Sequence, residues 1–334
     1  EDYSNKNQPY GILSGRNLEE QLDTTRELEN QDEKKNKVDF ALWKKAPVEH
    51  IMRWQSPWGE GFPGWHIECS AMASKYLGET FDIHGGGMDL LFPHHESEIA
   101  QSHTCSSVQP VKYWMHNNMI TVNGKKMGKS YNNTITLREL FSGNHALLEQ
   151  AYSPMTVRFL ILQSHYRSTL DFSNEALQAA EKGLQRLMKA NALLKKLTVV
   201  DANEGDEKTN LEIETSLNEA FNNLSDDFNT AGTVAQLFSI SSVINSLHAG
   251  QLAVKKIGTK MFQRLQNDFV VLIENILGLR DEATNDDAAL NGLVNLFIDM
   301  RAEAKQKKDF ATSDNIRNQL IALGIKLKDN KDGT

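Results

Sequence analysis

The sequence predicts an α/β domain over its first part and a bundle of α-helices over the rest. Between residues 66 and 122, segments with apolar residues at helical spacing alternate with short apolar runs typical of strands. This alternation is typical of a sheet whose connecting loops gather along one edge. Beyond Thr136 only the helical spacing remains. The 334 residues are enough for two or three domains with buried cores.

The composition excludes several classes of protein. Hydrophobic residues make up 40% and charged residues 24% of the chain, as in ordinary globular proteins. There is no apolar run of about 18 residues that could cross a bilayer, and no signal peptide opens the sequence. The two cysteines, Cys69 and Cys105, cannot form a disulfide framework or a CxxC motif. We therefore expect a soluble cytoplasmic protein that has no membrane partner.

The first 65 residues fall into two parts. Residues 1 to about 45 are polar, and the charged run 27–37 contains little that could enter a core, so we expect a surface insertion or flexible arm. Residues 54–65 are rich in aromatic residues, proline and glycine, which predicts a structured loop.

The elements of the α/β part follow in order. A helix is predicted over 66–77, ending at Gly78, and a second over 93–103, with proline in its first turn. A strand over 81–84 is predicted to enter Gly85, Gly86 and Gly87, whose bare backbone N–H groups could approach a nucleotide, although most glycine triplets are simply turns. Further strands are predicted over 111–116 and 119–122, the latter followed by an Asn123-Gly124 turn.

The second half shows helical spacing in seven segments separated by glycine or polar breaks. They are 137–141, 154–163, 175–197, 211–224, 231–247, 260–277 and 290–307. The acidic stretches 201–210 and 281–287 are the predicted boundaries. The net charge is −8, yet residues 301–334 carry eight basic against five acidic residues, and residues 182–196 hold a second basic cluster. Either basic cluster could be only a solvated helix face.

Two groups of residues suggest chemistry. His94, His95 and Glu98 fall at the start of one predicted helix, where residues four apart share a face, and Cys69 on the preceding helix could add a thiolate. Such a set suits zinc, although on spacing alone a buried structural cysteine beside helix-capping residues is the better explanation. In Lys125 to Ser130, two lysines flanking Met-Gly after a strand could place ammonium groups on a triphosphate, unless the loop is merely solvated.

Several motifs together resemble one family. Lys126-Met127-Gly128-Lys129-Ser130 resembles the KMSKS loop of class I aminoacyl-tRNA synthetases, with glycine at the place of the first serine. Residues 64–72, 81–90 and 92–101 closely resemble cysteinyl-tRNA synthetases, and the likeness continues through 113–116, 164–168 and 226–230. The resemblance therefore covers nearly the whole chain.

The resemblance implies a function and a set of site residues. It implies a partial Rossmann-like catalytic domain followed by an anticodon-binding helical region, and ATP-dependent ligation of L-cysteine to tRNA(Cys) through a cysteinyl-adenylate. The implied cofactors are one Zn²⁺ and the Mg²⁺ that accompanies ATP, and the implied oligomeric state is a monomer. The implied roles are zinc binding for Cys69, His94 and Glu98, substrate binding for Trp65 and His84, ATP binding for Gly86, Asp89 and Lys129, and catalysis for Lys126 and Lys129.

The resemblance also implies a division of the chain. Residues 1–50 would be a connective insertion, 51–135 the second half of the catalytic domain, 136–200 a stem-contact region, 201–284 a tRNA-binding bundle and 285–334 a small anticodon-binding subdomain. Phe297, Arg301, Lys305 and Phe310 are the candidate tRNA contacts.

One departure from the family affects the expected activity, and two alternative functions stay open. The family's first nucleotide-binding half, with its HIGH-type histidine pair and a fourth zinc ligand, is absent from these 334 residues, so we expect a fragment of doubtful activity. A cysteine-activating ligase that acts on an amino sugar and a non-catalytic tRNA-binding module are the two alternatives.

Overall fold

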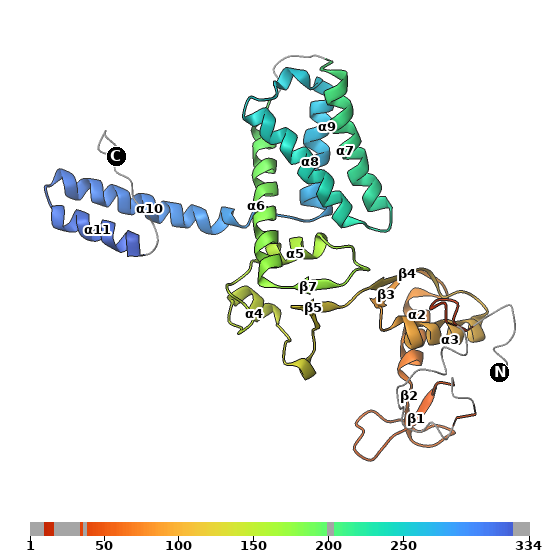
Figure 1. Cartoon of the computed structure of the whole chain (residues 1–334). Coiled ribbons are helices and arrows are strands. Elements are labelled where there is room, and N and C mark those ends of the chain that lie inside the picture. Colours follow the sequence, from red (N-terminus) through yellow and green to blue (C-terminus); the bar gives the residue numbers. More distant parts are fainter. Residues whose placement is uncertain (1–9, 17–33, 36–38, 199–203, 323–334) are drawn as a thin grey trace. The chain divides into compact units, whose positions relative to one another are not determined.

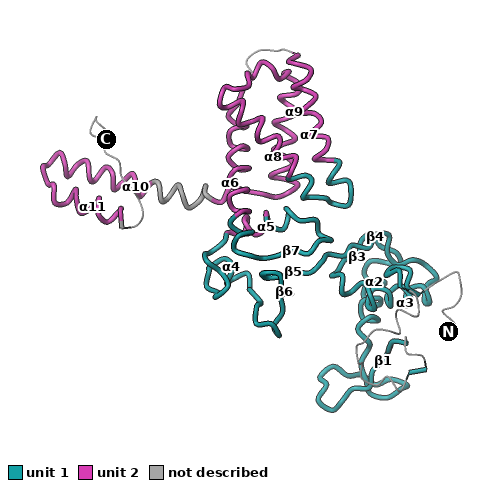
Figure 2. The backbone as a smooth tube through the Cα atoms, in the orientation of Figure 1, with its two compact units in different colours: residues 1–152, 160–178, 222–234 teal, residues 153–159, 179–221, 235–334 magenta. Residues whose placement is uncertain are grey.

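The computed structural model describes residues 10–16, 34–35, 39–198 and 204–322. Figure 2 colours two compact units: residues 1–152, 160–178 and 222–234 form the first, and residues 153–159, 179–221 and 235–334 form the second. The first unit contains all the strands of the described residues and the second is helical. The predicted fold class, an α/β part followed by a helical bundle, is confirmed. The charged run 27–37 lies almost wholly outside the described residues.

The first unit begins with a small antiparallel pair that was not predicted. Strand β1 (Trp43–Lys45) pairs with β2 (Gly61–Pro63) from the aromatic loop. A side chain at Gly61 would meet the carbonyl oxygen of Lys44, so only glycine lets the two backbones approach this closely. Residues 43–45 therefore belong to a strand and not to a flexible arm, because pairing between distant residues outweighs the polar composition.

A parallel pair of strands and two helices form the next part of this unit. Helix α2 (Trp65–Leu77) ends at Gly78 with φ 94°, as predicted. Strand β3 (Phe81–Gly87) pairs with β4 (Val111–Asn117) in parallel along its length. The glycine triplet belongs to β3, so the predicted turn there is wrong. Its three residues pair with β4, and a side chain at Gly86 would clash with His95.

Helix α3 (Glu96–Ser106) begins three residues later than predicted. The preceding segment, Leu91–His95, is a wide π-type turn interrupted by Phe92, which is extended at φ −139° and ψ 133°. Ser70 of α2 donates a hydrogen bond to Gln101 of α3 at 2.7 Å, so the two helices are joined by a buried polar contact. This geometry places His94 and His95 before α3 and not within it.

A three-stranded sheet in the order β6–β5–β7 completes the strands. Strand β5 (Ile120–Val122) turns through Asn123 and Gly124, both at positive φ, into β6 (Lys125–Lys126), which confirms the predicted turn. Strand β7 (Leu170–Phe172) pairs in parallel with β5 and was not predicted, because three residues carry no alternation signal. Helix α4 (Leu137–Ser142) starts with a capping box formed by Thr136 and Glu139.

The helical segments of the second half are confirmed with shifted ends (Figure 1). They are α5 (Pro154–Leu162), α6 (Asn174–Lys196), α7 (Glu207–Ser225), α8 (Thr230–His248) and α9 (Thr259–Val270), which continues as a π-helical turn over Val271–Ile276. Leu187, Leu217, Leu237 and Phe269 are fully buried and belong to the core of the bundle. Arg264 of α9 binds Glu214 of α7 at 3.0 Å.

The two acidic stretches predicted as domain boundaries, 201–210 and 281–287, both run into helices, so the linkers are shorter than predicted. Helix α7 begins inside the stretch 201–210, since Asp206 accepts a hydrogen bond from the backbone N–H of Thr209 at 3.0 Å and caps it. Helix α10 (Ala283–Gln306) takes up most of the stretch 281–287, and α11 (Phe310–Ala322), which was not predicted, follows after a turn. No helix of the described residues is both long and apolar enough to cross a membrane.

Candidate functional site

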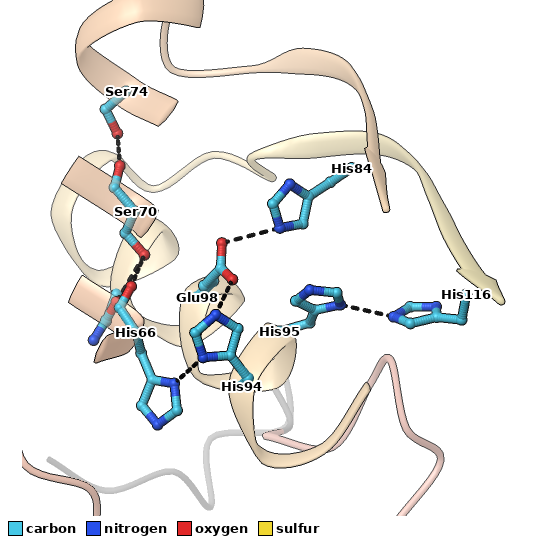
Figure 3. Close-up of polar contacts among 9 residues, drawn as sticks. His66, Ser70, Ser74, His84, His94, His95, Glu98 and His116 are labelled. Atoms are coloured by element: carbon cyan, nitrogen blue, oxygen red, sulfur yellow. Dashed lines mark hydrogen bonds and ion pairs between the residues drawn. The ribbon is translucent and has the colours of Figure 1, made fainter. Parts of the chain in front are cut away.

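Cys69, His94 and Glu98 come together in the first unit. Cys69 lies on α2, His94 in the turn before α3, and Glu98 in the first turn of α3. The Nε2 atom of His94 lies 3.1 Å from Oε1 of Glu98 (Figure 3). One ligand atom from each of the three residues falls within 4.8 Å of the other two. The geometry therefore brings together a sulfur, a nitrogen and an oxygen donor.

Glu98 also faces a second group of histidines. Its Oε2 atom lies 3.3 Å from Nε2 of His84 on β3 (Figure 3). His95 approaches His116 of β4 at 2.7 Å between ring nitrogens, and the ring of Trp114 lies 5.0 Å from that of His95. His84, His95 and Glu98 form a second set whose donor atoms lie within 4.8 Å of one another, so the two sets share one carboxylate.

Three further residues of the site have no chemical signal in the sequence: His66, Trp114 and His116. His66 lies one residue after Trp65 on α2, and its Nδ1 atom is 2.6 Å from Nδ1 of His94. Trp114 and His116 reach the site because β4 pairs with β3, in the register His84 with Trp114 and Gly86 with His116. The only available indication was that residues 64–72 and 113–116 resemble the family.

Burial controls the charge of this cluster. Burial, followed by the nearby imidazoles of His84, His116 and His94, lowers the pKa of His95 to about 3. Burial and then His94 lower the pKa of His66 to about 4. The pKa of His94 is lowered mainly by burial, although Glu98 opposes the shift. These three imidazoles are therefore neutral at pH 7, which is the form that binds metal ions.

The donor set fits a zinc ion. Oε1 of Glu98 is buried and accepts no hydrogen bond from the described residues, although His94 lies close by. Burial and then the carboxylate of Glu98 raise the pKa of the Cys69 thiol. A dication would satisfy the unpaired oxygen and stabilise the thiolate, and mixed sulfur, nitrogen and oxygen ligands suit Zn²⁺.

Trp65 and the glycines of β3 border the cluster. The Trp65 side chain is 57% exposed, and its ring lies 4.0 Å from that of His94, so it covers His94 while facing solvent. The side of Gly86 where a side chain would project is filled by His95 and Leu90. Asp89 is exposed, and its carboxylate occupies the space that a side chain at Gly87 would need.

The loop over residues 125–130, which carries Lys126 and Lys129, is held by Asn133, a residue that no sequence motif indicated. The buried side chain of Asn133 accepts a hydrogen bond from the backbone N–H of Gly128 at 2.9 Å and donates one to the carbonyl of Lys126 at 3.0 Å. Lys126 ends β6, and Lys129 starts a short helical turn; both are exposed. The loop therefore has an ordered backbone with two accessible ammonium groups.

A further contact joins two segments that are about 60 residues apart. The hydroxyl of Tyr166 donates to Asp227 at 2.6 Å, and Arg167 Nε lies 2.8 Å from the same carboxylate. Asp227 and Phe228 both have φ 54°, which is unusual for residues other than glycine. The carboxylate thus ties a strained turn between α7 and α8 to the segment before β7.

The candidate RNA contacts at the end of the chain differ in exposure. Phe297 and Phe310 are 38% and 63% exposed, whereas Arg301 is buried and is therefore a poor choice for contact with RNA. The basic residues of α6 (Lys182, Arg186, Lys189, Lys195 and Lys196) lie on its exposed side. Two of them have neighbours in the same unit: Lys195 pairs with Glu274, and Arg186 lies over the ring of Phe238.

Comparisons with known proteins match two parts of the chain to described families. Residues 2–182 match the family described as tRNA synthetases class I (C) catalytic domain, and residues 221–280 match the DALR domain. The chain is 54% identical to a cysteine–tRNA ligase of Bacteroides fragilis and 56% identical to one of Bacteroides thetaiotaomicron, in each case over 98% of this chain and 66% of the relative. A cysteine–tRNA ligase of Cytophaga hutchinsonii is 51% identical over 100% of this chain and 67% of its own length. The chain thus spans about two thirds of the length of these relatives.

Proposed function

Because the chain belongs to the class I (C) family of tRNA synthetase catalytic domains, we propose that the protein carrying it is an ATP-dependent cysteine–tRNA ligase. The relatives named above are cysteine–tRNA ligases. The observation that supports this substrate best is the buried group of Cys69, His94 and Glu98 beside the half-exposed Trp65, because these donors suit a metal that recognises a thiol.

The proposed basis of amino-acid selection is the metal-binding set. Cys69, His94 and Glu98 would hold Zn²⁺, which when bound supplies a Lewis acid able to take the cysteine side chain as a thiolate. Serine would lose this strong ligand bond, and a site built around such a bond can reject a close analogue by a large factor. Trp65 and His84 are the proposed walls of the amino-acid site, since both border the metal-binding set.

His66 would hold the imidazole of His94 in one tautomer, and burial would keep that imidazole in its neutral form. His66 and His94 share a short contact between their Nδ1 atoms, which leaves Nε2 of His94 to face Glu98. A hydrogen bond at the second ring nitrogen commonly fixes the tautomer of a metal-binding histidine. Because burial keeps His66 and His94 neutral, the imidazole of His94 is ready to act as a ligand near pH 7.

Lys126 and Lys129 are the proposed catalytic groups for adenylate formation. In this reaction the cysteine carboxylate attacks the α-phosphate of ATP and pyrophosphate leaves. Their ammonium groups would stabilise the negative charge that develops on the phosphates, together with the Mg²⁺ that accompanies ATP. The hydrogen bonds of Asn133 support this role because they hold the loop backbone that carries both lysines. Gly86 and Asp89 are the further proposed ATP contacts.

The helical part would bind tRNA(Cys). Residues 136–200 are the proposed stem-contact region, 201–284 the bundle, which includes the DALR match, and 285–334 the anticodon-binding subdomain. Phe297 and Phe310 present exposed rings on which unpaired bases could stack, and Lys305, on the same helix as Phe297, would supply a cation. The buried Arg301 is left out of this proposal.

Cysteine-dependent exchange of pyrophosphate into ATP, followed by charging of tRNA(Cys), tests the proposal in the protein that carries this chain. Cys69→Ala should abolish cysteine-dependent exchange and bound zinc, whereas Cys105→Ala, at the exposed cysteine, should change neither. Exchange that survives Cys69→Ala at parent level would contradict the proposal. Exchange without tRNA charging would favour a ligase that joins cysteine to an amino sugar, and RNA binding without exchange would favour a tRNA-binding module.

A further inference from the structure

We propose that Glu96 is a positioning residue for the metal-binding set. Its buried carboxylate binds residues 10–15, here called the N-terminal turn, and so holds His66 and His94 in place. The inference rests on the proposed function, because it concerns the ligand set assigned there. It also gives a role to a segment that the sequence predicts to be a flexible arm.

Glu96 is 1% exposed, and its carboxylate accepts hydrogen bonds from three backbone N–H groups. The N–H of Gly11 donates to Oε1 at 2.9 Å, and the N–H of Ser14 donates to Oε2 at 2.9 Å. The N–H of Leu13 lies between them, at 3.2 Å from Oε2 and 3.4 Å from Oε1. Hydrogen bonds to an ionised oxygen are stronger than neutral ones and compensate for burial of the charge.

The shape of the N-terminal turn explains why three donors meet one carboxylate. Gly11 and Gly15 have φ 105° and 67°, in the left-handed region that favours glycine, and the N–H of Gly15 closes the turn onto the carbonyl of Gly11 at 2.8 Å. Successive N–H groups in such a turn form a concave anion-binding surface. Here the anion is supplied by the protein itself, from a residue 85 positions further along the chain.

Aromatic contacts connect the N-terminal turn to the metal-binding set. The Tyr10 ring lies against Phe40 and Phe92, with ring centroids 6.4 and 6.2 Å away. Phe40 in turn packs edge-on against His66 at 5.6 Å, and His66 contacts His94 at 2.6 Å between their Nδ1 atoms. A displacement of the N-terminal turn would therefore remove the packing behind His66, and with it the partner that orients His94.

Glu96 acts from the side of α3 away from the metal-binding set. Residues two apart on an α-helix point about 200° from each other, so Glu96 and Glu98 leave the same helical turn on nearly opposite faces. The hydroxyl of Ser97 between them donates to the carbonyl of Pro93 at 2.7 Å and lies 3.4 Å from the Tyr10 hydroxyl. These contacts fasten the start of α3 to both the N-terminal turn and the segment that carries His94.

The test compares Glu96→Gln with Glu60→Gln in the protein that carries this chain. Glu60 is an exposed glutamate of the same unit whose carboxylate pairs with the surface residue Arg53, and it belongs to no proposed site. Two quantities are measured: the rate of tryptic cleavage after Arg16, and the affinity for Co²⁺ together with its absorption spectrum. Glu96→Gln places an amide N–H₂ against backbone donors, so we expect cleavage to become about tenfold faster. Loss of a supporting partner should weaken Co²⁺ binding about tenfold and change the spectrum.

A second variant keeps the test decisive if Glu96→Gln does not fold. Gly11→Ala leaves α3 intact but strains the N-terminal turn at φ 105°, and it should produce the same two changes. Faster cleavage with unchanged Co²⁺ affinity and spectrum would overturn the positioning role and leave Glu96 as a purely structural residue. Unchanged cleavage would overturn the contact itself. If the parent protein binds no Co²⁺, the metal site of the proposed function fails, and this result is distinguishable because it needs no variant.

Discussion

Replacing Gly86 by alanine should destabilise the first unit, whereas the same change at the adjacent Gly85 should not. A methyl group at Gly86 would lie 2.8 Å from Cε1 of His95 and 2.8 Å from Cδ1 of Leu90. Leu90 can move aside, but the His95 ring is held by His116 at 2.7 Å. At Gly85 the nearest atom, the carbonyl oxygen of Met115, would be 3.4 Å away, which is ordinary contact.

The expected magnitude follows from three contributions to the free energy of unfolding. Overpacking by one methyl group typically costs about 1–3 kcal/mol. Displacing His95 also breaks its contact with His116, which is worth about 0.5–1.5 kcal/mol. Replacing glycine by alanine restricts the unfolded chain and returns about 0.4–1 kcal/mol. We therefore expect Gly86→Ala to lose about 2 kcal/mol, and Gly85→Ala to stay within about 0.5 kcal/mol of the parent or to gain slightly.

Urea unfolding followed by tryptophan fluorescence measures both variants, since Trp114 lies 5.0 Å from the His95 ring and reports on this region. Equal stability of the two variants, or a loss at Gly85 as large as that at Gly86, would refute the reasoning from packing. The comparison also separates two roles for Gly86. If the glycine were needed only to let a nucleotide approach, Gly86→Ala would impair ATP binding without changing the stability of the metal-free protein.

Three further predictions concern other contacts. Asp227→Ala should cost about 2 kcal/mol of stability, because it removes the acceptor of Tyr166 and leaves alanine at φ 54°, whereas Asp227→Asn should cost less than half as much in thermal unfolding. Asn133→Ala should release the loop at Gly128, lowering stability by about 1–2 kcal/mol and speeding tryptic cleavage there; parent-level cleavage would contradict the role of Asn133. Lys195, by a hydrogen bond, lowers the pKa of Glu274, so the unfolded state binds more protons than the folded state. Stability should therefore fall as the pH drops from about 4.5 through the folded pKa, and Glu274→Gln should remove that part of the pH dependence in urea titrations.

Parts of the fold that depend on local backbone chemistry follow from the sequence. The end of α2 at Gly78, the turn at Asn123 and Gly124, and the long helices α6 to α9 agree with the predictions. Each depends on residues within a few positions, such as a glycine that tolerates positive φ or an apolar face that repeats at helical spacing. The same local signals also place Cys69 and Glu98 on separate helices.

The extended glycine triplet shows where local signals mislead. Three consecutive glycines suggest a turn because glycine tolerates positive φ. In β3 they are extended and paired with β4, and the reason for Gly86 is the space that His95 occupies. The sequence shows a glycine at position 86, but the side chain that makes glycine necessary there is His95, in the turn before α3.

By itself, the sequence determined the fold class, the succession of helices and the residue types able to bind a metal. Only the tertiary structure decided that His84 and His95 lie beside Glu98 and that His66 and His116 contact His94 and His95. It also decided that Glu96 binds a turn 85 residues earlier and that Asp227 holds Tyr166. The physical reason is the range of the interactions. Backbone preferences act within one turn of the chain, whereas a buried carboxylate takes whatever donors strand pairing and helix packing bring to it, and those partners have no fixed spacing in sequence.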